Sequence, residues 1–314
     1  MDLPKVVAFG GGHGLAATLQ ALKRLTHNLT AIVTVADDGG SSGRLRHEFD
    51  CLPPGDLRMA LAALTGDSPD GRLWADVLQS RFGGDGPLAG HAVGNLLIAG
   101  LWQRFPDPVT GLDQIGRLLD ASGRVLPMAA VPLLINADVA GLDPADPTVV
   151  RRIDGQAAIA DTRGDVLRVR IEPINPPAVP AAVEAIAQAD YLVFGPGSWF
   201  TSVIPHLLVP ALADAIMAAS AQRIVLMNLL PSGETSGFTP SRHLETLAAH
   251  CPKLRIDQVL ADHQFADQDP YLEPIVASMG GRLLIGDLAM RDGSARHDPF
   301  LLAATLALVM KLSV

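Results

Sequence analysis

Short aliphatic runs alternate with longer helical patterns along nearly the whole chain, and this alternation constrains the fold more than any other feature. Helical patterns include residues 15–25 and 203–220, the second interrupted by Pro205 and Pro210. Strands separated by helices are typical of βα units, whose strands lie parallel. The sequence therefore predicts an α/β fold with a mainly parallel sheet and helices on both of its faces. The predicted strands are residues 6–9, 31–35, 191–194, 224–228, 258–261 and 283–285.

Residues 125–173 depart from this alternation. The segments VLPMAAVPLLINADVAG and GDVLRVRIEP are typical of antiparallel strands and hairpins. We therefore expect a β-rich insert in this range. The chain has 314 residues, 48% of them hydrophobic, which is enough to bury a large core. We expect a single α/β domain spanning residues 1–314.

Charge and composition exclude several classes of protein. The formal net charge of −9 argues against a nucleic-acid groove, because binding to a phosphate backbone needs an extended basic face. The two cysteines, Cys51 and Cys251, have neither disulfide-framework nor zinc-type spacing. Neither a secretory signal nor an apolar stretch of about 20 residues is found. We expect a cytoplasmic protein without a membrane span.

The first candidate binding element is the glycine-rich turn GGGHG, which joins the strand at 6–9 to the first helix. Its residues Gly11, Gly12, His13 and Gly14 lie where backbone N–H groups and the helix N-terminus favour an anion. The turn lacks the lysine and hydroxyl of a P-loop and does not match the dinucleotide fingerprint GxGxxG. The alternative is that the glycines serve only close packing of strand against helix.

A second element, VADDGGSSGRLR, begins where the next predicted strand ends. Asp37 and Asp38 are expected at the carboxyl edge of the sheet, where open α/β folds bind their ligands. Ser41 and Ser42 follow in a loop rich in hydrogen-bond donors. The two acids would suit ribose hydroxyls, Mg²⁺ or a turn cap. Mg²⁺ is the candidate cofactor, although the sequence requires none.

Two further segments carry polar residues at predicted helix starts. In PPGDLR, Asp56 is either the N-cap of a helix over 57–64 or a ligand contact. In HAVGN, His91 and Asn95 are spaced i, i+4 and are predicted to share one helix face. A satisfied structural histidine is the alternative to a ligand-facing one.

Near the C-terminal half, two segments repeat the theme of a loop before a helix. The strand at 191–194 runs into GPGS, where Gly197 and Ser198 are expected to face the first glycine turn. In RHDP, Asp298 is the predicted N-cap of the last helix. That leaves Arg296 just before a helix start, where it would meet a phosphate.

Taken together, these segments resemble the YvcK family of bacterial gluconeogenesis factors, which is related in fold to the CofD 2-phospho-L-lactate transferases. The matching motifs run in order over almost the whole chain: GGGHGL, ADDGGSSGRLR, PPGD, HAVGN, GPGSWFTS, GETSGFT and RHDP. The resemblance implies a Rossmann-like fold, a UDP-N-acetylglucosamine ligand, and a role in cell-wall synthesis and cell shape during gluconeogenic growth. By position, it implies a pocket lined by Gly11, Gly12, Asp37, Asp38, Ser41, Ser42, Asn95, Gly197, Ser198 and Arg296.

Three functions remain open on the sequence. The first is a nucleotide-sugar binding protein that regulates cell-wall synthesis through partner proteins, with a homo-oligomer as one possible state. The second is a CofD-like transferase that acts on a phosphorylated substrate and a nucleotide with Mg²⁺ on Asp37 or Asp38. The third, a nicotinamide-dependent oxidoreductase, is the weakest because GxGxxG is absent.

Overall fold

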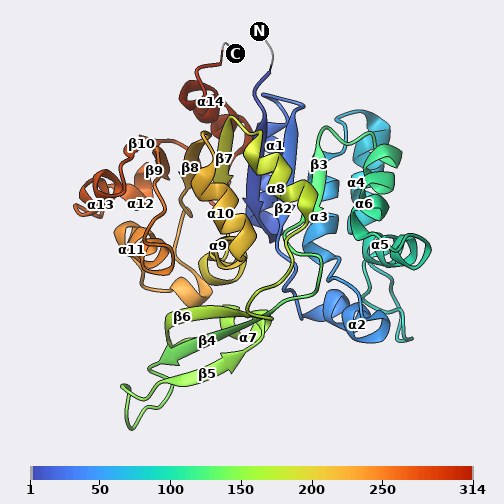
Figure 1. Cartoon of the computed structure of the whole chain (residues 1–314), viewed down its shortest axis with the longest axis horizontal. Coiled ribbons are helices and arrows are strands. Elements are labelled where there is room, and N and C mark those ends of the chain that lie inside the picture. The colour runs from blue at the N-terminus through green and yellow to red at the C-terminus, as the bar shows by residue number, and fades with distance from the viewer. Residues whose placement is uncertain (1–2, 313–314) are drawn as a thin grey trace.

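A seven-stranded, fully parallel sheet forms the centre of the molecule in the computed structural model, which describes residues 3–312 (Figure 1). Its strand order is β10-β9-β8-β7-β1-β2-β3. Val6 at the start of β1 pairs with Leu29 of β2 on one side and Tyr191 of β7 on the other. The strands are β1 (Val6–Gly10), β2 (Leu29–Val33), β3 (Arg124–Pro127), β7 (Tyr191–Phe194), β8 (Gln222–Leu226), β9 (Gln258–Asp262) and β10 (Arg282–Gly286).

The strand order reverses direction between β1 and β7. From β1 the chain proceeds outward to β2 and β3, and from β7 it proceeds the other way to β8, β9 and β10. Such a reversal leaves a crevice at the carboxyl ends of the two central strands, where open α/β sheets bind ligands. Both glycine-rich loops follow these strands, so the topology places them at the crevice.

Helices pack in two groups around the sheet. Helices α1 and α14 contact each other and α1 contacts α3, whereas α10 contacts α8 and α9. The helices are α1 (Gly12–Leu22), α2 (Gly40–Phe49), α3 (Gly55–Leu64), α4 (Pro69–Gln79), α5 (Val93–Arg104), α6 (Pro108–Leu118), α8 (Pro180–Ala187), α9 (Pro205–Leu208), α10 (Pro210–Ala218), α11 (Pro240–His250), α12 (His263–Ala266), α13 (Leu272–Ser278) and α14 (Pro299–Val309). Two short elements complete the chain, a π-helix η1 (Trp199–Val203) and a 3₁₀-helix η2 (Gly233–Thr235).

The predicted strands are all present, and their aliphatic runs explain why. Val6 and Phe9 of β1 and Ile32 of β2 are fully buried, because strands covered on both faces must be apolar throughout. The helix predicted at 203–220 is divided into α9 and α10, which begin at Pro205 and Pro210. Each proline occupies the first helical position, where its missing N–H costs nothing.

The β-rich insert is a separate three-stranded antiparallel sheet of order β5-β4-β6. It contains β4 (Leu134–Ala140), β5 (Arg151–Asp154), β6 (Asp165–Glu172) and the short helix α7 (Gln156–Ala160). The predicted range began too early: residues 124–127 form β3, which pairs parallel with β2 in the main sheet. Figure 1 shows the insert at the bottom of the view, on the side where the main strands end.

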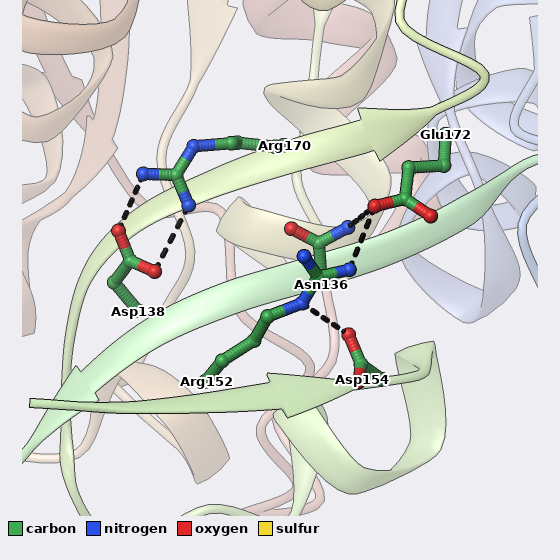
Figure 2. Close-up of polar contacts among 6 residues, drawn as sticks. All are labelled: Asn136, Asp138, Arg152, Asp154, Arg170 and Glu172. Atoms are coloured by element: carbon green, nitrogen blue, oxygen red, sulfur yellow. Dashed lines mark hydrogen bonds and ion pairs between the residues drawn. The ribbon is translucent and has the colours of Figure 1, made fainter.

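The two faces of the insert differ in chemistry. Ile135, Ala137 and Val139 of β4 are buried against the rest of the protein. The other face carries a ladder of charged side chains (Figure 2). Arg170 pairs with Asp138 at 2.6 Å, and Arg152 pairs with both Asp154 and Glu172 at 2.7 Å. These pairs are exposed to solvent, which screens them, so they add little to stability and keep the outer face polar.

Within residues 3–312, the structure contains no helix that is long and apolar enough to cross a membrane.

Candidate functional site

The two glycine-rich loops touch each other at the crevice between β1 and β7. A Cβ added at Gly14 would overlap the carbonyl of Pro196, so no other residue fits this contact without movement. The Thr18 hydroxyl of α1 donates to the carbonyl oxygen of Gly195 at 3.2 Å. The loop after β1 and the loop after β7 therefore form one continuous wall.

The side chain of Asp56 lies beneath the first loop. Its carboxylate sits so close to Gly11 that a Cβ there would overlap Oδ2, and the Gly12 N–H hydrogen-bonds to the same carboxylate. Burial, together with the nearby charge of Asp37, raises the pKa of Asp56 to about 7, against the lowering effects of the Gly12 hydrogen bond and of Arg58. Oδ2 has no hydrogen-bond partner among the described residues. A buried carboxyl group in this state is available to a ligand.

Asp56 is not an N-cap, which was one of its two predicted roles. Helix α3 begins two residues before the predicted start, with Pro54 at the N-cap and Asp56 inside the first turn. Its carboxylate makes no cap hydrogen bond to its own helix. It faces the start of α1 instead.

The two acids after β2 have different environments. Asp37 accepts a hydrogen bond from the Gly39 N–H at 3.0 Å and lies near Asp56. Asp38 accepts from the Ala157 N–H of α7 at 3.1 Å. Asp37 therefore faces the glycine-loop side, whereas Asp38 holds the insert against the loop after β2.

Ser42 connects this loop to α3. Its hydroxyl accepts the Gly55 N–H at 2.9 Å, which satisfies one backbone group at the start of that helix. The contact brings the loop after β2 next to PPGD.

Ser41 connects the same loop to HAVGN. Its hydroxyl lies 2.9 Å from His91 Nδ1 and accepts from Asn95 Nδ2 at 3.0 Å. Burial and the charges of Arg44 and Arg81 lower the pKa of His91, which favours the neutral ring. Asn95 Oδ1 is buried and has no hydrogen-bond partner among the described residues.

His91 and Asn95 do not share a helix face as predicted. Helix α5 begins at Val93, so His91 lies in the preceding loop. The structure still brings the two side chains together, because both bind the Ser41 hydroxyl.

Two residues that sequence reasoning missed hold the second glycine loop. Asn228 clamps Gly197 by accepting its N–H at 2.9 Å and donating to its carbonyl at 3.0 Å. Glu234 accepts the Ser198 hydroxyl at 2.6 Å. Burial raises the pKa of Glu234, although the hydrogen bond from Ser198 opposes the shift. The motif GETSGFT contains Glu234, but nothing in its local pattern indicates a partner 36 positions away.

Ser198 is the N-cap of η1, where its hydroxyl also accepts the Thr201 N–H. The carboxylate of Glu234 therefore lies at this helix start. A carboxyl group therefore already occupies the region in which a phosphate was expected by analogy with the first loop.

Arg296 and His13 lie at the surface. Arg296 pairs with Asp292 at 3.2 Å and hydrogen-bonds Ser294, and its side chain is 69% exposed. His13 is exposed in the first turn of α1. The structure gives neither side chain a contact with the buried polar residues around Asp56.

His297 differs from its neighbour Arg296. It is buried, and burial lowers its pKa to about 4, while Asp262 and the Met227 backbone favour the charged form. The predicted cap is confirmed next to it, since Asp298 accepts the N–H groups of Phe300 and Leu301 at the start of α14.

Four helices begin at these loops without a capping hydrogen bond from the N-cap side chain. They are α1, α2, α3 and α5, whose N-cap residues are Gly11, Gly39, Pro54 and Ala92. Among the other helices, α7, α8, α9, α10 and α13 also lack such a bond, whereas Ser68, Asp107, Thr239, Asp262 and Asp298 cap α4, α6, α11, α12 and α14. The Gly12 and Gly55 N–H groups are already bonded to Asp56 and Ser42. Each of these helix starts still carries partial positive charge, so the convergence of the four favours an anion.

A metal ion at this site would be held by few protein side chains. No group of three or more histidine, cysteine, aspartate or glutamate side chains in residues 3–312 is arranged to hold one. Asp37 and Asp56 are the neighbouring acids that fit a Mg²⁺, which is commonly held by one or two carboxylates together with phosphate oxygens. Asp38 fits less well because the α7 backbone occupies it.

Comparison with known proteins identifies the family. Residues 6–274 match the family model described as 2-phospho-L-lactate transferase CofD. A putative gluconeogenesis factor of Mycobacterium tuberculosis is 55% identical over 305 residues, which cover 96% of this chain and 89% of the relative. The gluconeogenesis factor of Listeria innocua is 42% identical, covering 94% and 92%.

The fold comparison agrees. The crystal structure of a UPF0052 family member from Bacillus halodurans superimposes with a TM-score of 0.84 and 32% identity, covering 98% of this chain and 99% of that one. The expectation of a Rossmann-like fold is thus confirmed. The chain therefore belongs to the CofD family and, within it, to the bacterial gluconeogenesis factors of the YvcK family.

Proposed function

We propose that this protein binds UDP-N-acetylglucosamine at the crevice between β1 and β7, with the diphosphate at the uncapped helix starts. The observation that carries the proposal is the convergence of α1, α2, α3 and α5 on one cluster of polar residues. Backbone N–H groups at such starts bind phosphate without any lysine or arginine in the loop. The choice of a uridine diphosphate sugar rests on the resemblance to the YvcK family.

The buried polar atoms around Asp56 support a ligand with hydroxyl and amide groups. Asp56 Oδ2, Asn95 Oδ1 and Thr34 Oγ1 are buried without a partner among the described residues. Leaving such atoms unpaired costs free energy, and a bound polar ligand would restore their hydrogen bonds. A sugar or ribose that donates hydroxyl protons to two of these oxygens has the matching chemistry.

We further propose that ligand binding regulates cell-wall synthesis and cell shape during gluconeogenic growth, through contacts with cell-wall synthesis or regulatory proteins. This part rests on the family resemblance. The Asp38 contact supports a route for the signal, because it joins a ligand-side loop to the insert at 3.1 Å.

A second candidate function is a Mg²⁺-dependent transfer of a phosphorylated group, as the description of the family model suggests. One observation favours it: Asp37 lies close enough to Asp56 to raise its pKa. Two neighbouring acids beside phosphate-binding loops would hold Mg²⁺, which supplies charge stabilisation for phosphoryl chemistry. Asp56 would bind it in its ionised form.

Titration calorimetry with UDP-N-acetylglucosamine, with and without Mg²⁺, followed by chemical analysis of the recovered ligand, tests these functions. The binding function predicts saturable binding and a ligand recovered intact. The transferase function predicts dependence on Mg²⁺ and a cleaved or transferred product. An absence of binding under both conditions would contradict the proposed ligand.

A further inference from the structure

Arg58 is a buried cation without an ion pair. It lies in the first turns of α3, two residues after Asp56, and is only 5% exposed. Within residues 3–312, no carboxylate oxygen lies within 4.0 Å of its guanidinium group. Nη1 donates to the neutral Gln79 side chain, and Nε is buried with no partner in the part of the chain that the structure describes. Uncompensated buried charge is costly, so such a residue calls for an anion.

The position of Arg58 is set by the HAVGN motif. A Cβ added at Gly94 would lie 2.8 Å from Cγ and 2.9 Å from Cδ of Arg58. The aliphatic stem of Arg58 therefore rests against the first turn of α5, one residue from Asn95. This contact explains why a glycine stands at position 94.

Arg58 is placed next to the polar cluster by its neighbours in α3 and α5. Asp56, two residues earlier in α3, lies against the loop after β1, and Asn95, which follows Gly94 in α5, donates to the Ser41 hydroxyl. Burial lowers the pKa of Arg58, the charge of Arg81 lowers it further, and Asp56 and Asp37 oppose the shift. The stem of Arg58 therefore lies beside the uncapped start of α5, and its Nε has no partner among the described residues.

We propose that Arg58 is a phosphate-binding residue of this site. Its Nε donates to a phosphate oxygen of the ligand, and the phosphate supplies the ion pair that the guanidinium lacks among residues 3–312. The inference rests on the proposed function and deepens it by naming the cation that the glycine loops lack. An arginine binds phosphate more strongly than neutral donors do, because its hydrogen bonds are charge-assisted.

The test uses UDP and inorganic pyrophosphate as probes in titration calorimetry on the full chain. Arg58→Gln keeps a polar group that can pair with Gln79 but removes the charge. We expect it to weaken the binding of both probes by about 10- to 100-fold. Arg81→Gln is the matched control: it removes an exposed charge nearby and should weaken binding by less than about threefold.

The stability of the free protein supplies a second readout. If the charge of Arg58 has no partner until a ligand anion binds, Arg58→Gln removes an uncompensated charge. The ligand-free variant should then melt at the same temperature as the wild type or at a higher one. A purely structural arginine would give the reverse, a lower melting temperature with unchanged affinity. If Arg58→Gln fails to fold, Arg58→Lys takes its place in the test. The lysine keeps the charge but has no Nε, and this variant should fold and bind with intermediate affinity.

The outcomes separate this inference from the nucleotide proposal. Pyrophosphate binding that depends on Arg58, together with no binding of UDP-N-acetylglucosamine, would support the inference and contradict the proposed ligand. The inference is overturned if both Arg58 variants bind the probes within about threefold of the wild type. It is also overturned if Arg81→Gln weakens binding as much as Arg58→Gln, or if the wild type binds neither probe.

Discussion

The carboxylate of Asp56 lies directly against Gly11, so that the loop after β1 and the start of α3 exclude any side chain between them. The Gly12 N–H completes the contact by hydrogen-bonding to the same carboxylate. The Asp56 side chain thus fixes the backbone of the glycine turn.

Gly11→Ala should destabilise the protein and abolish binding to the first loop. The new methyl group would overlap Asp56 Oδ2 and lie 2.6 Å from Thr34 Cγ2, and overpacking of this kind costs about 1–3 kcal/mol. Chemical denaturation measures the loss. Gly100→Ala in α5 is the control, because open space surrounds that position and alanine is the better helix former, which should add up to about 1 kcal/mol. Equal effects at the two positions would contradict the close contact.

Asp56→Asn should change how stability depends on pH. The folded pKa of Asp56, about 7, is above its ordinary value of 3.8, so between these values the folded state binds more protons than the unfolded state. Stability contributed by this group is therefore complete below about pH 4 and is lost as pH rises through 7. An asparagine at this position cannot ionise, and the variant should gain on the wild type by an amount on the order of a few kcal/mol by about pH 8. Parallel pH profiles of the two proteins would rule out the raised pKa.

Ser198→Ala should leave the buried carboxylate of Glu234 without its hydroxyl donor. The loss of a partner to a buried carboxyl group costs roughly 1–3 kcal/mol, and the second glycine loop should loosen. Thermal unfolding measures the change. Ser236→Ala, at an exposed position of the same segment, should have little effect. If Ser198→Ala unfolds at the same temperature as Ser236→Ala, the pairing with Glu234 does not stabilise the loop.

Asp38→Ala should release the insert from the loop after β2. The Ala157 N–H at the start of α7 would lose its acceptor, and hydrogen exchange should accelerate in α7 and in β4, which packs against it. Exchange in β9, at the far side of the main sheet, serves as the internal control. An unchanged exchange rate in the insert would show that other contacts hold it in place.

The sequence was sufficient for the main sheet and for the loops that surround the site. Strands such as β7 are continuous apolar runs, and a parallel sheet buried on both faces requires such runs. The β3 strand was the exception. Its four residues, RVLP, lie next to the insert, and only pairing with β2 assigns them to the main sheet.

Contacts between distant segments explain what the sequence could not predict at the site. Glu234 is 36 positions from Ser198, and Ser41 is 50 positions from His91, so no local pattern relates these residues. The position of Asp56 before an apolar run is typical of a helix cap. Its side chain instead lies against the glycine loop after β1, which comes much earlier in the chain. Arg296 stood before a helix start, but a hairpin turn directs it to Asp292 at the surface.

The most direct test of the central claim is a crystal structure of the protein with UDP-N-acetylglucosamine bound. We predict diphosphate density within hydrogen-bonding distance of backbone N–H groups at the starts of α1, α2 or α3, beside Asp37 and Asp56. Density for the diphosphate at the exposed Arg296, or at the η1 start with Glu234 displaced, would contradict the account.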